Sequence, residues 1–221
     1  MVRLDLRRPR RTSVVEQHHA HTLRDLLEAA CVRPDQGRAF QDADTSVAVA
    51  LVDPDGATLG RTAEQIGVDG GEALPFENDV TDSFQFERSV DLVIKEWGRL
   101  DILVNNAGIF SEAPIEDMSD ERWAQTMEVN LRGTMFCTRT VVPHMLERGW
   151  GRILSAASAF ARTGRAGYTA YAASKAGIIG MTKSLAKEMA PRGITVNSDH
   201  RGRLSVSGIS VNVPGITTWF P

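Results

Sequence analysis

Residues 98–108 read GRLDILVNNAG and contain the most informative change of pattern in the chain. Gly98 follows a stretch in which apolar residues recur at helical spacing, and glycine there is typical of a helix end. Residues 102–104 then form a short apolar run, as expected for a strand that is buried on both faces. Residues 105–108, which follow, are small and polar. Ligands of parallel sheets bind beyond the carboxyl ends of strands, so 105–108 is a candidate binding loop.

The same alternation extends over residues 45–197. Short apolar runs predict strands at 46–52, 73–76, 102–104, 152–155 and 194–197, and helical spacing predicts helices at 57–66, 83–97, 120–148 and 171–189. Strands that alternate with helices and are apolar on both faces indicate a parallel sheet covered by helices on both sides. The predicted fold class is therefore α/β, with a Rossmann-like doubly wound parallel sheet.

The composition predicts a single large domain. The chain has 221 residues, 42% of them hydrophobic, and a formal net charge of −3, which gives no overall attraction to nucleic acid or anionic membranes. No apolar run is long enough for a membrane helix, and the basic N-terminus lacks the apolar core of a secretory signal. Cys31 and Cys137 have no motif spacing. We therefore expect a cytoplasmic protein with reduced thiols.

A tyrosine and a lysine four residues apart suggest acid–base chemistry. Residues 168–177, YTAYAASKAG, hold both tyrosines of the chain, and Lys175 follows Tyr171 by one helical turn. A nearby cation favours the phenolate form of a tyrosine, whose pKa is ordinarily about 10. One lysine in water could not bring that pKa near neutrality, so burial and a second cation would be needed. Taken alone, such a pair is more often a chance feature of a helix than a functional one.

Two further polar residues bear on whether the Tyr171–Lys175 pair is functional or a chance feature. Ser158 lies thirteen residues before Tyr171 and just beyond a predicted strand, where its hydroxyl could reach a reacting oxygen. Asn130 lies inside a predicted helix, although asparagine is a poor helix former. A surface position is the ordinary explanation for such an asparagine. The alternative is that Asn130 passes protons to Lys175 through water.

Several segments together resemble the short-chain dehydrogenase/reductase family, in particular its 3-oxoacyl reductase and secondary-alcohol dehydrogenase members. The segments are NNAG at 105–108, VNLRG at 129–133, Ser158, YAASK at 171–175, DVTD at 79–82, GRLDILVNNAG at 98–108 and KSLAKEMAPRGITVN at 183–197. The resemblance covers roughly residues 37–198. It implies hydride transfer between NAD or NADP and a small-molecule carbonyl or alcohol substrate.

The resemblance also implies roles for individual residues. Tyr171 would be the general acid when a carbonyl is reduced and the base when an alcohol is oxidised, while Lys175 would lower its pKa and hold the nicotinamide ribose. Ser158 would orient the substrate oxygen, and Asn130 would complete a proton relay. The remaining residues implied to bind the cofactor are Asp79 and Val80 beside the adenine, and Asn106, Ala107 and Gly108 along the cleft.

The N-terminal part departs from this pattern. Family members begin with a strand and a T-G-x-x-x-G-x-G turn, whose backbone approaches the cofactor pyrophosphate. Counting back from the second strand places this turn near residues 26–33, which read LLEAACVR and contain no glycine. Side chains there would block the phosphates, and no strand of adequate length is evident before them. We therefore expect residues 1–36 to be an atypical segment and the sheet to be incomplete at its first strand.

The C-terminal tail departs as well. The family continues after the strand at 194–197 with a Pro-Gly turn, a substrate-covering segment and a last strand. Here residues 208–212, GISVN, repeat the pattern of residues 193–197, GITVN, and no recognisable lid follows. We expect residues 37–198 to form the Rossmann-like domain and 199–221 an atypical tail, without the last strand. An open sheet edge would weaken the homo-oligomer that family members usually build through the helices at 120–148 and 171–189.

The end of the second strand bears on the choice between NAD and NADP. The family often carries an acidic residue there that binds the adenosine ribose, and by alignment this position is Leu51. Asp53 lies two residues further and would point to the same side of the strand. Because no arginine or lysine is present there to receive a 2′-phosphate, we expect NAD in preference to NADP.

The main alternative to an oxidoreductase is a catalytically impaired remnant that acts as a binding or oligomerisation module, because the phosphate-binding turn is not recognisable. Residues 1–40 hold eight basic and five acidic residues, which more often form a solvated arm than a nucleic-acid contact. His18, His19 and His21 lack companion ligands, so no metal is expected. No nucleic acid or membrane partner is expected, and the substrate cannot be read from the sequence.

Overall fold

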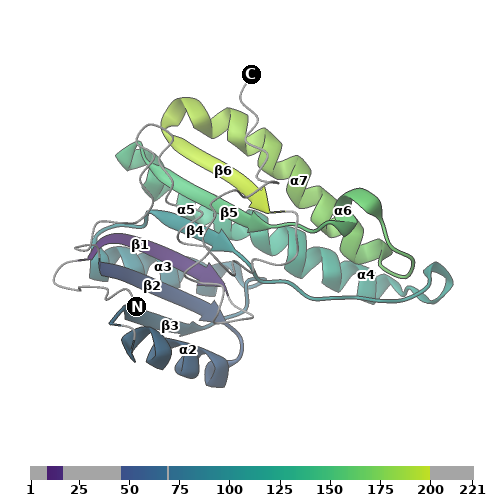
Figure 1. Cartoon of the computed structure of the whole chain (residues 1–221), viewed down its shortest axis with the longest axis horizontal. Coiled ribbons are helices and arrows are strands. Elements are labelled where there is room, and N and C mark those ends of the chain that lie inside the picture. The colour runs from purple at the N-terminus through teal and green to yellow at the C-terminus, as the bar shows by residue number, and fades with distance from the viewer. Residues whose placement is uncertain (1–8, 17–45, 69, 200–221) are drawn as a thin grey trace, which may run out of the picture.

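A sheet with strand order β3-β2-β1-β4-β5-β6 lies at the centre of the molecule (Figure 1). The computed structural model describes residues 9–16, 46–68 and 70–199. The strands are β1 (Pro9–Glu16), β2 (Ser46–Asp53), β3 (Glu72–Glu77), β4 (Ile102–Asn105), β5 (Gly151–Ala156) and β6 (Ile194–Asp199). All neighbouring strands are parallel, and the chain reverses its direction of travel across the sheet between β1 and β4. Doubly wound sheets bind ligands at this kind of switch point.

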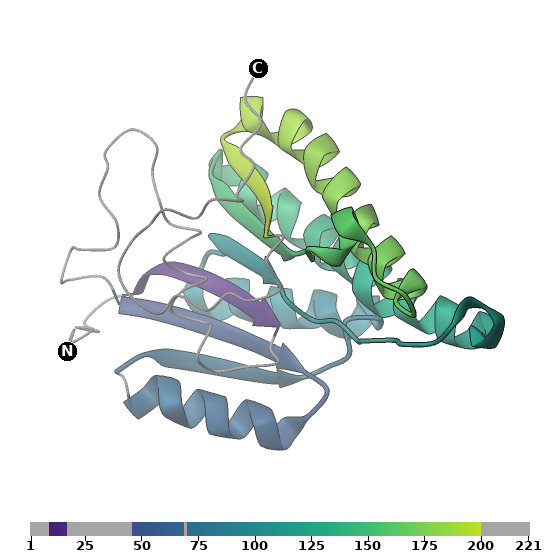
Figure 2. The same cartoon turned by 45° about the vertical axis from the view of Figure 1, so that its right-hand side comes forward.

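Helices cover both faces of the sheet. They are α2 (Gly56–Val68), α3 (Ser83–Trp97), α4 (Asp120–Met127), α5 (Thr134–Arg148), α6 (Phe160–Thr163) and α7 (Thr169–Met189). Two short 3₁₀ turns, Ile115–Asp117 and Ala190–Arg192, complete the connections. Figures 1 and 2 show α3 and α5 behind the sheet, α2 beside β3 and α7 beside β6. The predicted α/β class and Rossmann-like arrangement are confirmed.

The alternation of side chains along β2 explains why helices are needed on both faces. Ala50 and Val52 belong to a buried cluster with residues of α3, α5 and α7. Val49 and Leu51 belong to a second cluster with Leu59 of α2. Successive side chains of a strand point to opposite faces, so a strand that is apolar throughout must be covered twice. Burial of these side chains is the main stabilising contribution to the sheet.

The helix ends lie where local chemistry predicts them. Asp82 caps α3 by accepting a hydrogen bond from the backbone of Gln85, and Gly98 ends the helix in the left-handed region with φ 71°. Ser119 caps α4 in the same way, through the backbone N–H of Arg122 at 3.2 Å. Gly149 ends α5 with φ 61°. These caps fix the lengths of the helices and therefore the positions of the loops between them.

The structure corrects the prediction for the first strand. Residues 9–16, PRRTSVVE, form β1 in the middle of the sheet, with Ser13 opposite Val49 of β2 and Val14 opposite Leu103 of β4. No strand was predicted here, because only residues 12–15 are β-branched or small and the charged residues Arg10, Arg11 and Glu16 flank them. A parallel strand between two strongly apolar neighbours can form on the strength of its backbone hydrogen bonds and a short β-branched run.

The helix predicted over residues 120–148 is a second correction. It is divided by a π-helical segment, Glu128–Gly133, between α4 and α5. Such a bulge is rare and often occurs at functional sites, because it shifts the side chains that follow it around the helix. Asn130, the residue that is out of place in a regular helix, lies inside this segment.

Several predictions fall on residues that the structure does not describe. They concern the turn expected near residues 26–33, the histidines at 18, 19 and 21, Cys31, and the tail from residue 200 onward. A last strand beyond β6 belongs to the same group. Among the helices that are described, none is both long and apolar enough to cross a bilayer.

Candidate active site

The carboxyl ends of the strands meet on one side of the molecule, together with α4, α6 and the beginning of α7 (Figures 1 and 2). This arrangement follows from the parallel sheet, because every strand runs in the same direction. The predicted site residues on β4, β5 and α7 are therefore brought to one edge, although they are far apart in the sequence.

Ser158, Tyr171 and Lys175 form the centre of the site. Ser158 follows β5 and is buried, and its hydroxyl lies close enough to Tyr171 to lower the pKa of the phenol. The backbone N–H of Phe160 donates to the Ser158 hydroxyl oxygen at 3.2 Å, which orients the hydroxyl. Lys175 Nζ lies 5.7 Å from the centre of the Tyr171 ring and donates to the carbonyl oxygen of Ala156 at 2.8 Å. The structure thus brings the three predicted catalytic side chains into one place.

The pKa of Tyr171 does not move in the expected direction. Burial raises the pKa of its phenol above the ordinary value, and the hydrogen bond with Ser158 opposes this rise only in part. Tyr171 is therefore a protonated phenol at neutral pH, ready to act as an acid. Lowering this pKa would require positive charge beyond that of Lys175, as the sequence analysis anticipated.

Asn130 is fully buried and connects three elements. Its Oδ1 accepts from the backbone N–H of Ile109 at 2.7 Å, and its Nδ2 donates to the Ile109 carbonyl at 3.0 Å and to Ser174 Oγ at 3.1 Å. Ser174 Oγ in turn donates to the carbonyl of Tyr171 at 2.7 Å. The π-helical segment therefore holds both the loop after β4 and the first turns of α7. A position on the surface, the ordinary explanation for this asparagine, is excluded.

Gly108 lies where a side chain would not fit. A Cβ atom on Gly108 would be 3.2 Å from Asn130 Oδ1 and 3.3 Å from Lys175 Nζ. Both contacts are tighter than ordinary van der Waals distances. The loop 105–108 therefore approaches Asn130 and Lys175 closely, and its residues Asn106, Ala107 and Gly108 are half-buried.

Asn105 was not predicted as a site residue, although it begins the same loop. Its Nδ2 donates to Thr138 Oγ1 and to Ser155 Oγ, both at 3.1 Å, and so joins β4, β5 and α5. Its Oδ1 is buried and has no hydrogen-bond partner among the described residues. An unused acceptor is thus available next to Asn106.

The residues predicted to lie near the adenine are arranged differently. Asp53 is buried at the end of β2, and its Oδ1 accepts from the backbone of Asp55 at 2.8 Å. Asp79 is exposed and accepts from both the backbone and the hydroxyl of Thr81 at 2.8 Å. Val80 is part of the core, and a Cβ on Gly133 would collide with it. The side chain of Val80 is therefore a packing residue, and only its backbone could contact a ligand.

The carboxyl end of β1, at Glu16, fixes where a phosphate-binding turn would begin. That place is the sequence directly after Glu16, earlier than residues 26–33, where the sequence analysis expected the turn. These residues are outside the described part of the chain. Their sequence contains no glycine before Gly37. The departure from the family pattern therefore remains when the position of the turn is corrected.

Three residues around Tyr171 were not predicted as part of the site. The ring of Phe110, in the loop after β4, lies 4.7 Å from the rings of both Tyr168 and Tyr171. The Tyr168 hydroxyl donates to Glu112 Oε2 at 2.7 Å, and this bond to a carboxylate raises the pKa of Tyr168. The position of Phe110 two residues after NNAG was an available signal, but nothing in the sequence links it with residue 168.

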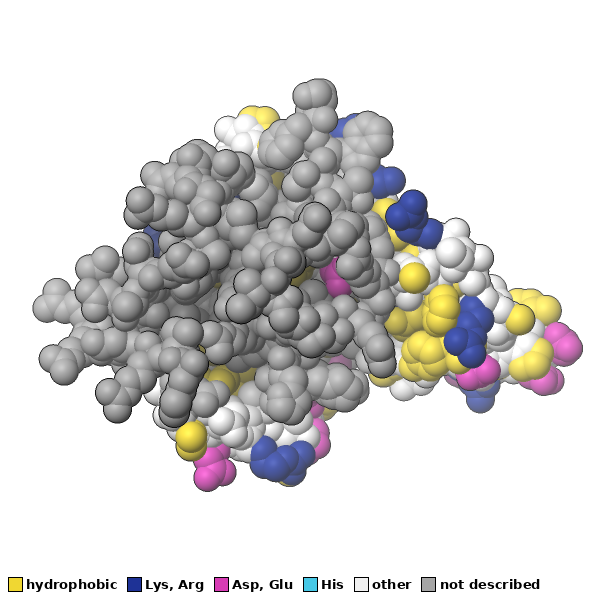
Figure 3. All heavy atoms as spheres, in the orientation of Figure 1, with side chains coloured by type: hydrophobic (Ala, Val, Ile, Leu, Met, Phe, Trp, Pro, Cys, Tyr) yellow, Lys and Arg dark blue, Asp and Glu magenta, His cyan; other side chains and the backbone are white. Residues whose placement is uncertain are grey.

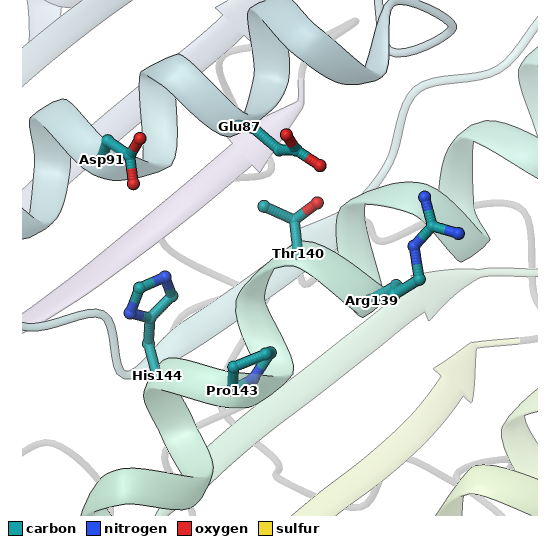
Figure 4. Close-up of a pocket in the computed structure, with 6 residues that line it drawn as sticks. All are labelled: Glu87, Asp91, Arg139, Thr140, Pro143 and His144. Atoms are coloured by element: carbon teal, nitrogen blue, oxygen red, sulfur yellow. The ribbon is translucent and has the colours of Figure 1, made fainter.

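A cavity of about 320 Å³ lies elsewhere, between α3 and α5 (Figure 4). It is lined by Glu87, Asp91, Arg139, Thr140, Pro143 and His144. None of these residues belongs to the strand ends or to the group around Tyr171. This cavity is therefore not the candidate active site.

Comparison with known proteins identifies the family of this chain. A family model described as short chain dehydrogenase matches residues 38–209. The 3-oxoacyl-[acyl-carrier-protein] reductase FabG of Thermotoga maritima is 44% identical over 128 residues, which are 58% of this chain and 52% of that protein. D-threitol dehydrogenase of Mycolicibacterium smegmatis is 39% identical over 150 residues, which are 68% of this chain and 58% of that protein. The matched part of the chain thus spans between half and two thirds of these relatives.

Solved structures agree with this result. The structure of NAD⁺-bound xylitol dehydrogenase aligns with a TM-score of 0.72 and 26% identity, over 88% of this chain and 70% of that one. A variant of actinorhodin polyketide ketoreductase with NADPH aligns with a TM-score of 0.73 and 30% identity, over 86% and 69%. The family model alone matches well over half of the chain. The chain belongs to the short-chain dehydrogenase family.

Proposed function

We propose that this protein is an NAD- or NADP-dependent oxidoreductase that interconverts a carbonyl and a secondary alcohol. The observation that carries the proposal is the shared position of three side chains: the Ser158 hydroxyl lies close enough to Tyr171 to lower the pKa of the phenol, and the Lys175 ammonium lies 5.7 Å from the same ring. An acid, an orienting hydroxyl and a cation in one buried place are what proton transfer to a carbonyl oxygen requires.

Each side chain has a distinct part in the proposed reaction. Tyr171, protonated at neutral pH, gives its proton to the carbonyl oxygen as the alcohol forms. Ser158, whose oxygen is already held by the Phe160 N–H, donates its own hydrogen bond to the same oxygen and stabilises the charge that develops there. The Lys175 ammonium then stabilises the phenolate that remains on Tyr171. Asn130 and Ser174 keep the first turns of α7 in place, and we propose that Asn130 also passes protons onward.

The residues at the strand ends fit the nicotinamide end and the adenine end of a nicotinamide cofactor. Such a cofactor, when bound, supplies or accepts the hydride. Lys175 and the loop 106–108 would hold its nicotinamide end, and Asp53 and Asp79 would lie toward its adenine end. Because Asp53 carries a negative charge at the end of β2, we propose NAD in preference to NADP. The proposed assembly is a homo-oligomer formed through α5 and α7.

The experiment that tests this proposal is a titration of the purified protein with NADH and with NADPH, followed by the fluorescence of the reduced nicotinamide. Saturable binding, together with reduction of a ketone, is the expected result. Tighter binding of NADH than of NADPH would support the assignment of Asp53. Absence of binding at millimolar concentrations of both cofactors would contradict the proposal.

One observation favours a second candidate, a catalytically impaired remnant that retains only binding or oligomerisation. Residues 17–36, which follow β1, contain no glycine, and a glycine turn normally lets the backbone approach the pyrophosphate. The remnant predicts that the chain folds and self-associates but binds neither cofactor. Size-exclusion chromatography beside the titration separates the two candidates.

A further inference from the structure

Phe110 has an unusual combination of exposure and contacts. Its side chain is 58% exposed, yet its ring lies 4.7 Å from the rings of Tyr168 and Tyr171. Single exposed apolar residues are common and need no function. Phe110 differs because the group on which it packs is the tyrosine that we assign to proton transfer. One face of its ring is thus supported by the site, and the rest is available to a ligand.

Other aromatic residues extend this surface. Phe160, on the short helix after β5, lies 5.5 Å from Tyr168, and its own backbone N–H holds Ser158. The guanidinium of Arg165 lies 4.7 Å from the Tyr168 ring and 5.3 Å from the Phe160 ring. Figure 3 shows hydrophobic side chains beside basic and acidic ones in this part of the surface, over α4, α6 and the beginning of α7.

The loop that carries Phe110 is fixed in place. The Tyr168 hydroxyl donates to Glu112 at 2.7 Å, and the backbone N–H of Ala113 donates to the Gly167 carbonyl at 2.8 Å. Ile109, beside Phe110, is bonded through both backbone groups to Asn130. Bonds on both sides of Phe110 therefore define its position before a substrate arrives. A preformed surface loses less conformational entropy on binding than a flexible one.

We propose that Phe110 and Phe160, both packed on the buried ring of Tyr168, form an aromatic subsite that binds an aryl substituent of the carbonyl or alcohol substrate. This inference rests on the proposed function, because it places the reacting carbonyl at Ser158 and Tyr171. A carbonyl held there has one substituent next to the Phe110 ring. Aromatic rings attract one another in tilted and edge-to-face arrangements, so an aryl group is favoured at this position over an alkyl group of similar size.

The test compares phenyl methyl ketone with cyclohexyl methyl ketone, which are similar in size and differ in the aromatic ring. We expect Phe110→Ala to lower kcat/KM about tenfold for the phenyl ketone and less than about threefold for the cyclohexyl ketone. Phe110→Leu, which keeps the apolar volume, should show the same change in ratio to a smaller extent. Phe84→Ala is the matched control, because Phe84 is 67% exposed on α3 and has no place in the site.

The failure of the subsite and the failure of the proposed function give different results. If NADH binds and both ketones are reduced, an equal effect of Phe110→Ala on the two ketones would overturn the subsite and leave the function standing. If no ketone is turned over, binding of the two ketones is measured by ligand-observed NMR. Loss of the phenyl ketone signal alone in Phe110→Ala would then support the subsite, whereas equal signals in parent and variant would overturn it.

Discussion

The two halves of the sheet use their polar side chains in different ways. In the half formed by β4, β5 and β6, polar side chains bond to distant parts of the chain: Asn105 reaches Ser155, and Asn130 reaches Ile109 and Ser174. In the half formed by β1, β2 and β3, the side chains of Asp53 and Asp79 accept hydrogen bonds from residues only two positions away. Buried long-range bonds thus join the parts of the β4–β6 half, whereas these two aspartates of the β1–β3 half shape local turns.

If the proposed function holds, this difference separates catalysis from cofactor affinity. The long-range bonds hold the side chains to which we assign catalysis in a defined arrangement without help from a ligand, so the proposed acid–base centre is preformed. The local bonds beside β2 and β3 shape turns but do not build a phosphate cradle. We therefore expect changes in the β4–β6 half to affect the rate of reaction and the stability, and changes in the β1–β3 half to affect mainly the choice and affinity of the cofactor.

The largest effect is expected from Tyr171→Phe, in the β4–β6 half. The variant keeps the ring that packs on Phe110 but has no proton to donate, so we expect kcat to fall by about 10³-fold. Steady-state reduction of a ketone by NADH measures this loss. The thermal melting point and the affinity for NADH should stay close to those of the parent protein. If the variant retains more than about a tenth of the parent kcat, the Tyr171 phenol is not the proton donor.

Much of this half could be predicted because each of its motifs is local. The strand before NNAG, the end of α3 at Gly98 and the Ser119 cap all follow from short-range chemistry. Ser158, Tyr171 and Lys175 could be brought together only through the resemblance to the family, since no local rule links residue 158 with residue 171. The contact of Phe110 with Tyr168 could not be predicted, because it depends on how two loops meet.

The β1–β3 half was harder to predict for a different reason. β1 is central and parallel, so its backbone bonds to β2 and β4 stabilise it even though few of its residues are strongly apolar. A search for apolar runs does not find such a strand.

The π-helical segment around Asn130, in the β4–β6 half, was also not predicted, because its formation depends on tertiary bonds to Ile109 and Ser174.

Asn130→Ala is expected to have the next largest effect. Together with a matched variant in the β1–β3 half, it compares how much the polar side chains of each half stabilise the fold. The change leaves the N–H and the carbonyl of Ile109 without their partner in a buried place, so we expect the free energy of unfolding to fall by about 2–4 kcal/mol. Urea denaturation followed by circular dichroism measures it. The matched change in the other half is Asn78→Ala, which removes bonds to the Gln85 carbonyl and to Ser89.

Asn78 is only half-buried, and water can replace its bonds, so a loss of about 1 kcal/mol is expected there. If the two alanine variants lose equal stability, the buried bonds of Asn130 stabilise the fold no more than the half-buried bonds of Asn78 do. A larger loss for Asn78→Ala would reverse the expected order of the two halves.

The pH dependence gives a smaller effect that is confined to the β4–β6 half. Because the pKa of Tyr171 is raised by burial, alcohol oxidation, which needs the phenolate, should rise about tenfold per pH unit up to that pKa. Ser158→Ala removes the hydrogen bond that lowers this pKa, so the rising limb should move to higher pH. Profiles of kcat/KM for one alcohol, with parent and variant at the same cofactor concentration, measure the displacement. A profile that moves to lower pH would show that Ser158 does not stabilise the phenolate.

The smallest effect is expected in the β1–β3 half, from Asp53→Asn. The amide oxygen can still accept the bond from the Asp55 backbone, so the turn after β2 is kept and only the negative charge is lost. Loss of one charge near a 2′-phosphate should improve the affinity for NADPH relative to NADH by about two- to fivefold, as for other partly screened charge pairs. Asp55→Asn is the control: Asp55 carries the same charge two residues away, is exposed and bonds to Thr58. If both variants change the NADPH/NADH ratio equally, the effect is one of general charge and Asp53 does not select the cofactor; if only Asp53→Asn does so, selection belongs to the end of β2.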